Sequence, residues 1–215
     1  MLTRARAAVL TLTALTLSAC SAVHPGDAAV VAGESISMKS LNQTAAIYCT
    51  LTLRSAEAQG GAAPDNAELR RQAITSLVSV VIARRLAADA GVTPRPSDYE
   101  LTGAQKDQIA TAFPKGDLDQ INAAIEDSQE ISVISIALGA DSTGQARTEA
   151  NEAELAQAGR AQINAAYADN DVKFAPRFGL SSTTKQIAST GSISVAPADL
   201  AAPQPTDLPA AQRCS

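Results

Sequence analysis

The apolar residues of this chain recur mainly at the three- and four-residue spacing of an α-helix. Such runs predict five helices, at about residues 38–58, 65–90, 97–113, 117–139 and 149–168. The second run is the longest, and its apolar positions cover so wide a face that several neighbouring elements must bury it. The pattern therefore predicts a mainly α fold.

Residues typical of helix termini set the expected helix boundaries. The predicted N-terminal caps are Ser37, Asp65 with Glu68, Ser97 with Glu100, and Asp117. Gly91 and Gly139 are expected to end the second and fourth helices, because glycine readily adopts the left-handed backbone conformation found there.

Three short segments have patterns compatible with β-structure. Residues 29–31 precede a turn signal at Gly33 and predict a strand or hairpin before the first helix. Residues 172–174 alternate and predict a strand, and residues 192–195 are a further candidate. Residues 131–136 (ISVISI) also have strand propensity, but the helical spacing on both sides favours a helix.

The composition points to a core of small aliphatic side chains. Hydrophobic residues make up 46% of the 215 positions, but aromatic residues only 3%, and there is no Trp. The net charge of −5 and the absence of a basic stripe argue against nucleic-acid binding. The single histidine, His24, excludes a Ser-His-Asp triad within the folded body and a His-rich zinc site.

Residues 1–19 have the features of a secretory signal. Arg4 and Arg6 precede an apolar run at residues 7–17, which is too short for a permanent membrane span. The following Leu-Ser-Ala-Cys, residues 17–20, resembles the bacterial lipobox. The resemblance implies that Cys20 carries a lipid that anchors the protein to the extracytoplasmic face of the cell membrane. The alternative is an ordinary secretory signal with a chance cysteine.

The other two cysteines, Cys49 and Cys214, form an even pair once Cys20 is assigned to lipid. Disulfides are permitted in an exported chain, so we expect these two to pair, the alternative being two free thiols. The expected organisation is a signal at 1–19, a tether at 20–27 that holds His24, one domain at 28–196, and a Pro/Ala-rich tail at 197–215 that Cys214 would pin.

Three stretches together resemble the N-terminal domain of SurA/PrsA-type extracytoplasmic chaperones. They are AAVVAGESISMKSL from residue 28, LRRQAITSLVSVVIARRLAADAGVTPRPSDYE from residue 69, and VKFAPRFG from residue 172. The resemblance covers residues 28–126 well and 150–179 loosely. It implies a five-helix peptide-binding domain in which the strand near residue 172 pairs with the N-terminal strand.

Many members of that family also carry a parvulin prolyl isomerase domain, whose site resembles paired histidines near a Cys or Asp. This chain has only His24, so isomerase activity is not carried over and we expect no enzyme activity, cofactor or metal. Asp169-Asn170-Asp171 resembles the start of a calcium loop, but Lys173 and the missing glycine favour a simple turn.

Charged and apolar side chains offer two kinds of candidate surface. The arginines Arg70, Arg71, Arg84 and Arg85 lie on one predicted helix, where a solvated face is favoured over a patch for lipid headgroups or acidic clients. Asp127 and Glu130 are also expected to be solvated. The candidates for a client-binding concavity are Met38, Leu41, Tyr48, Leu77, Val81, Phe113, Phe174 and Phe178, although for each of them a place in the ordinary core is favoured.

The resulting expectation is a lipid-anchored chaperone-like protein that binds unfolded or exported polypeptides without catalysis. One alternative is a structural or assembly lipoprotein that binds a dedicated envelope partner. Prolyl isomerisation is the less favoured alternative.

Overall fold

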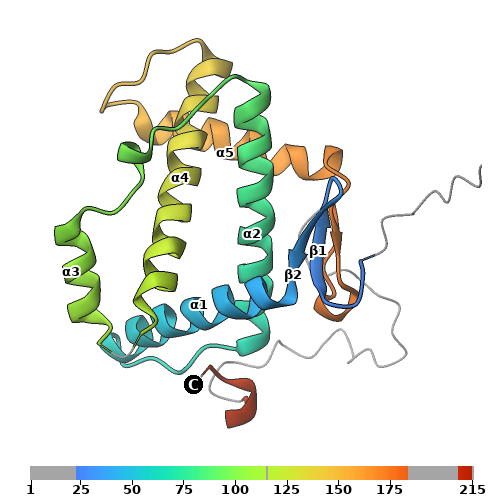
Figure 1. Ribbon diagram of the computed structural model, residues 1–215, viewed down its shortest axis with the longest axis vertical. Coiled ribbons are helices and arrows are strands. Elements are labelled where there is room, and N and C mark those ends of the chain that lie inside the picture. The colour runs from blue at the N-terminus through green and yellow to red at the C-terminus, as the bar shows by residue number, and fades with distance from the viewer. Residues whose placement is uncertain (1–22, 115, 184–207, 215) are drawn as a thin grey trace, which may run out of the picture.

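The computed structural model describes residues 23–114, 116–183 and 208–214, and within them the chain is mainly helical (Figure 1). The α-helices are α1 (Met38–Ala58), α2 (Asn66–Asp89), α3 (Gly103–Ala112), α4 (Leu118–Thr143) and α5 (Glu152–Asp169). The strands are β1 (Asp27–Val31), β2 (Glu34–Ser37) and β3 (Lys173–Phe174). The predicted mainly α fold, with a small β-element, is confirmed.

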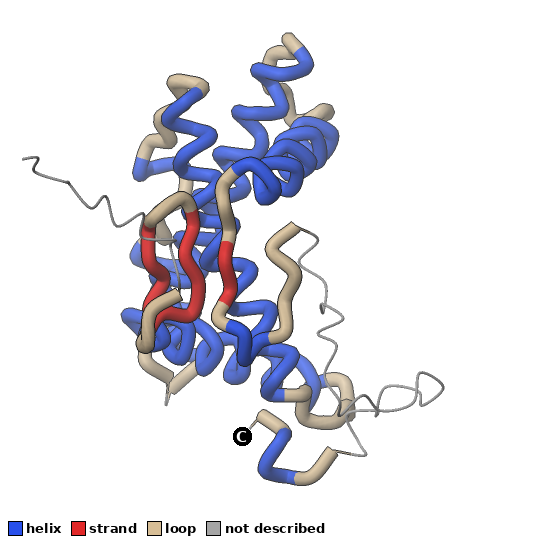
Figure 2. Tube along the Cα trace, turned by 90° about the vertical axis from the view of Figure 1, so that its right-hand side faces the viewer, coloured by secondary structure: helices blue, strands red, loops and turns tan. Residues whose placement is uncertain are grey.

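The strands form one antiparallel sheet in the order β2-β1-β3 (Figure 2). Ala32 and Gly33, both with positive φ, make the tight turn between β1 and β2. β3 returns from the far end of the domain to pair with β1, with Ala29 opposite Phe174. The expected pairing of the two ends of the domain is therefore present.

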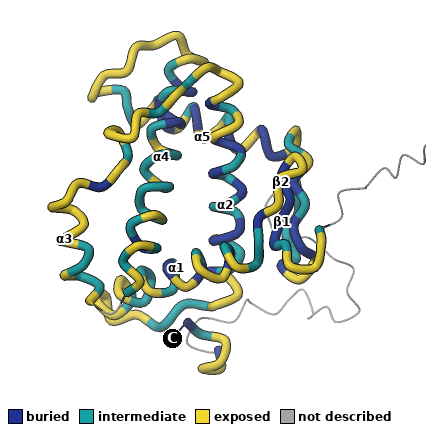
Figure 3. Tube along the Cα trace, in the orientation of Figure 1, coloured by how far each residue is buried: buried dark blue, intermediate teal, exposed yellow. Residues whose placement is uncertain are grey.

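Figure 1 shows how the helices are arranged around the core. α2 and α4 stand alongside each other, α1 crosses their lower ends, and α5 crosses behind their upper part. α2 has the wide apolar face that its sequence predicts, with Ile74, Val78 and Ile82 fully buried (Figure 3). The sheet packs on the same core through Ala28, Val31 and Ile36.

α4 and α5 cross at unusually close range because each helix has a glycine at the contact. A Cβ atom on Gly139 would lie 2.0 Å from the carbonyl oxygen of Leu155, and one on Gly159 would lie 1.8 Å from that of Ser135. Both approaches are far inside van der Waals contact, so only glycine fits at either position. The two backbones therefore touch without intervening side chains.

Tyr167 of α5 ties that helix to α2. Its ring is buried, with 1% of the residue exposed, and its hydroxyl donates to the carbonyl of Thr75 at 2.7 Å. The hydroxyl of Ser79 lies 2.8 Å from the Tyr167 oxygen. Burial raises the pKa of Tyr167 to about 12, because the charged phenolate is poorly solvated there.

The third helix begins later than predicted. Residues 97–100 do not form a capping box; Pro96–Asp98 makes one 3₁₀ turn, and α3 starts after Thr102. Leu101 is buried, and its N–H donates to the Glu126 carboxylate at 3.0 Å, which holds this segment out of a helix. The capping box that forms joins Thr102 and Gln105.

The fourth helix also ends differently, since it passes through Gly139 and stops at Gly144. Gly144 has the left-handed conformation, with φ of 66°, whereas Gly139 is needed for the crossing with α5. Residues 131–136 are helical, as favoured. α5 begins at Glu152 rather than near 149, because the Asn151 side chain accepts from the N–H of Thr148 and stabilises a turn there.

The close crossing predicts that Gly159→Ala will destabilise the fold. The new methyl group must push α4 and α5 apart, so we expect the free energy of unfolding to fall by about 3 kcal/mol. Urea denaturation followed by circular dichroism measures this. Gly103→Ala is the control, because a Cβ there meets no atom within 4 Å and alanine favours the helix. Equal stability of the Gly159→Ala and wild-type proteins would contradict the close crossing.

Tyr167 predicts a loss of stability at alkaline pH. Its folded pKa of about 12 exceeds the unfolded value near 10, so its contribution is complete below pH ~10 and is lost as the pH rises towards 12. We expect this residue to account for about 2–3 kcal/mol of that loss. Tyr167→Phe should show a correspondingly shallower decline above pH ~10, while the stability difference between the two proteins stays constant near neutral pH. If the free energy of unfolding changed with pH in the same way for both proteins over the whole range, the result would argue against a buried, neutral phenol at Tyr167.

Candidate functional site

A pocket opens where α1, α2 and α4 meet, and we call it the three-helix pocket. Its volume is about 230 Å³. Its lining residues are Ser40, Gln43, Thr44, Ile47 and Tyr48 of α1, Ser76, Leu77 and Val80 of α2, and Gln120, Ala123, Ala124, Asp127, Ser128 and Ile131 of α4. Aliphatic side chains from all three helices thus face one space.

Polar side chains lie among these aliphatic ones. Those of Gln43, Thr44, Ser76 and Ser128 have no hydrogen-bond partner among the residues that the structure describes. Amide and hydroxyl groups can donate and accept, so these four can bond to either end of a peptide group. The pocket therefore combines an apolar wall with uncommitted hydrogen-bonding groups.

One charged residue, Asp127, lines the pocket, and it shares an arginine of α2 with Glu130. Arg84 of α2 donates to Asp127 Oδ1 at 2.8 Å and to Glu130 Oε2 at 2.5 Å. The Glu130 hydrogen bond is the main cause of a raised Arg84 pKa, and Asp127 adds to it. Arg84 and Asp127 are 51% and 45% exposed, as expected for solvated side chains, whereas Glu130 is only 14% exposed. The expectation missed that α2 and α4 bring these charges together.

The other three arginines of α2 differ from Arg84. Arg71 pairs with Glu68 one turn earlier, at 2.8 Å. Arg70 and Arg85 have no ion pair within the described parts of the chain. The four arginines thus do not form one surface.

The eight predicted concavity residues separate into three groups. Tyr48 and Leu77 line the three-helix pocket. Five others belong to the hydrophobic core or pack on it without lining that pocket: Met38, Leu41, Val81, Phe174 and Phe178. Tyr48 and Leu77 also pack on the core. Phe113 caps the end of α3, where the Arg54 guanidinium lies 5.7 Å from its ring centroid.

Sequence reasoning missed most of the pocket lining. Ile47, Val80 and Ile131 follow the apolar pattern of their helices, and nothing in that pattern separates pocket positions from core positions. The nearest signal is the run of hydroxyl and amide side chains on the pocket side of α1, at Ser40, Gln43 and Thr44.

The remaining predicted chemistry falls elsewhere or outside the described residues. Asp169 ends α5 and Asn170 caps it, as expected for a turn. Within the described ranges, no three His, Cys, Asp or Glu side chains gather to hold a metal ion. His24 lies in the turn before β1, where its carbonyl accepts from the N–H of Asp27. Cys20 and residues 192–195 lie outside the described residues.

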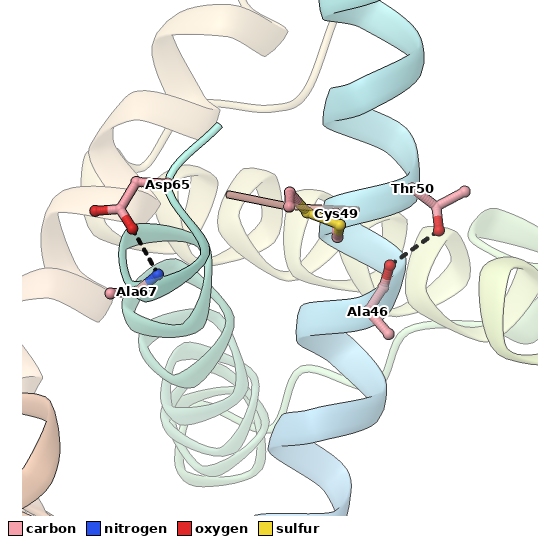
Figure 4. The surroundings of a disulfide bond; sticks show 6 residues. Ala46, Cys49, Thr50, Asp65 and Ala67 are labelled. Atoms are coloured by element: carbon pink, nitrogen blue, oxygen red, sulfur yellow. Dashed lines mark hydrogen bonds between the residues drawn. A yellow bond between two sulfur atoms is a disulfide. The ribbon is translucent and has the colours of Figure 1, made fainter. Parts of the chain in front are cut away.

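Cys49 and Cys214 lie at disulfide distance in the structure, with Cα atoms 5.7 Å apart (Figure 4). Cys49 lies on α1 and faces the start of α2, where Asp65 caps the helix. The N–H of Cys214 donates to the Pro64 carbonyl at 2.9 Å, and Arg213 forms an antiparallel bridge with Asp65. The C-terminal residues thus lie against the segment that joins α1 to α2.

No helix in the described residues has the length and hydrophobicity to cross a membrane. The chain matches no family model, no curated protein and no solved structure.

The cysteine pair predicts that both thiols resist alkylation until the protein is reduced. The disulfide would close a loop with a sequence separation of 165, so Cys49→Ser should lower the free energy of unfolding by about 3–5 kcal/mol. Denaturation of Cys49→Ser, Cys214→Ser and the double variant tests the coupling. The double variant should be no less stable than either single one. Two alkylatable thiols in the unreduced protein would contradict the pairing.

Proposed function

We propose that this protein is a lipid-anchored, extracytoplasmic chaperone that binds unfolded or exported polypeptides in the three-helix pocket without catalysis. The observation that carries the proposal is the pairing of an aliphatic wall with the four uncommitted polar side chains. The sequence resemblance to SurA/PrsA-type domains supports the same function, and the Cys20 lipobox supports the membrane anchor.

The occupant we propose is an extended segment of polypeptide with an aliphatic side chain. An unfolded chain presents main-chain N–H and C=O groups that need partners in any apolar site. Thr44, Ser76 and Ser128 can bond to those groups whatever the sequence, while Leu77 and Ile131 contact the inserted side chain. This division of roles fits a protein that binds many clients.

Charge and size fit the same occupant. Arg84 pairs with Asp127 and with Glu130, so this cluster keeps one net negative charge and the lining disfavours an anionic ligand. A volume of about 230 Å³ is smaller than the roughly 300–1,000 Å³ of sites that enclose a drug-sized molecule. The pocket has room for one or a few side chains of a client and not for a folded surface. Because so small a site buries little of the client, we expect binding to be weak and reversible, as shielding of exported chains requires.

Filling the pocket should weaken client binding. Ser128 is exposed on α4 and lines the pocket, so Ser128→Trp places an indole where the client side chain would lie. We expect its affinity for an unfolded client to fall at least about tenfold, equivalent to ~1.4 kcal/mol. The measurement is suppression of client aggregation by residues 21–215, together with peptide binding by fluorescence anisotropy.

Ser132→Trp is the matched control. Ser132 is exposed one turn further along α4 and does not line the pocket, so this variant should keep wild-type binding. Failure of the wild-type protein to suppress aggregation at several-fold molar excess would count against a chaperone. A single stoichiometric partner in in-cell crosslinking would instead favour the dedicated-partner alternative.

A further inference from the structure

A second, smaller pocket is lined mainly by arginines. Arg70 and Arg71 reach it from the first turns of α2, and Arg177 reaches it from the 3₁₀ turn Pro176–Phe178 that follows β3. Ala67 and Phe178 complete the lining, and the volume is about 160 Å³. We call this the arginine pocket.

Two of its three guanidinium groups are uncompensated. Arg71 is paired with Glu68, through both Nε and a terminal nitrogen. Arg70 and Arg177, by contrast, have neither an ion pair nor a side-chain hydrogen bond within residues 23–114, 116–183 and 208–214. Two like charges that share a pocket repel each other unless an anion lies between them. An anion bound between Arg70 and Arg177 would relieve this repulsion.

The chemistry of the lining selects a phosphate group. Each guanidinium is planar and offers several N–H donors in a fork that matches phosphate oxygens. Arg70 and Arg177 come from segments far apart in the sequence, so they can hold one phosphate from two sides. The buried Phe178 ring and Ala67 provide an apolar flank beside the charged groups.

The topology places the arginine pocket at the end of the sheet where the chain enters the domain. β3 runs antiparallel to β1, and the N–H of Ala175 donates to the Ala28 carbonyl at 2.8 Å. Arg177 comes shortly after β3, so it lies at the edge of the sheet where β1 begins. Val23 precedes that end and packs against the core. Cys20 is only three residues earlier, and three residues span at most about 11 Å.

We propose that Arg70 and Arg177 bind the phosphate of an anionic lipid headgroup, so that the domain is seated on the membrane at its tethered end. The inference builds on the proposed anchoring at Cys20, since the lipid would bring a bilayer surface within reach of this pocket. It adds a second, non-covalent contact, which would fix how the domain is oriented on the bilayer.

The test is co-sedimentation of the full chain with lipid vesicles. Arg70→Gln/Arg177→Gln should weaken binding to vesicles that contain phosphatidylglycerol by about thirtyfold, from about one factor of five per basic residue. Binding to pure phosphatidylcholine vesicles should not change. The control, Arg85→Gln/Arg160→Gln, removes the same charge at two exposed positions elsewhere and should bind as the wild type does.

Several outcomes separate the explanations. An equal loss in the control would show a general charge effect and overturn the site, as would no loss in Arg70→Gln/Arg177→Gln. Displacement by inorganic phosphate at constant ionic strength would assign the pocket to free phosphate and overturn the lipid assignment. Arg70→Lys/Arg177→Lys, which keeps the charge but loses the fork, should give intermediate binding and guards against misfolding of the glutamine variant.

The same measurements in a Cys20→Ala background keep this inference distinct from the proposed anchor. An arginine effect that persists there supports the headgroup site whether or not Cys20 carries lipid. Lipid found on Cys20 by mass spectrometry, without any arginine effect, supports the anchor and overturns the headgroup site.

Discussion

Two glycines allow the backbones of α4 and α5 to touch, and the positions of the other helices follow from that contact. With Gly139 and Gly159 in register, α5 lies directly against α4. This places Tyr167 where its hydroxyl reaches the carbonyl of Thr75 in α2. The spacing between α2 and α4, and with it the width of the three-helix pocket, therefore depends on a crossing that no side chain separates.

Two further links hold the walls of that pocket. Arg84 joins α2 to Asp127 and Glu130 of α4, beyond the pocket-lining Val80. At the other end, Cys49 and Cys214 lie at disulfide distance, and a bond between them would link α1 to the C-terminal residues, which also pair with the segment before α2. Exposed ion pairs contribute at most about 1 kcal/mol to the free energy of unfolding. The main effect of the Arg84 bridge is therefore on the relative position of α2 and α4 at the pocket, and its effect on the stability of the fold is small.

The sequence pattern predicted elements better than it predicted contacts. Periodicity identifies a helix from its own residues, so all five helices and the returning strand were foreseen. Gly139 was misread as a helix end because its role depends on Leu155, sixteen residues away on another helix. The pairing of Asp127 with Arg84 was not foreseen for the same reason, since Arg84 lies on a different helix. The pocket was missed because its aliphatic residues follow the same pattern as the core.

α2 connects the two proposed binding sites. Arg70 lies near its start, and Leu77 lines the three-helix pocket. Thr75 and Ser79, which hydrogen-bond to the Tyr167 hydroxyl, lie on either side of Leu77 in the sequence. At 1.5 Å per residue, Arg70 and Leu77 are about 10 Å apart along the helix axis. A headgroup bound at the arginine pocket would thus set the height of the client pocket above the membrane through one rigid helix. Because Tyr167 fixes that helix against α5, the two sites cannot shift independently of the core.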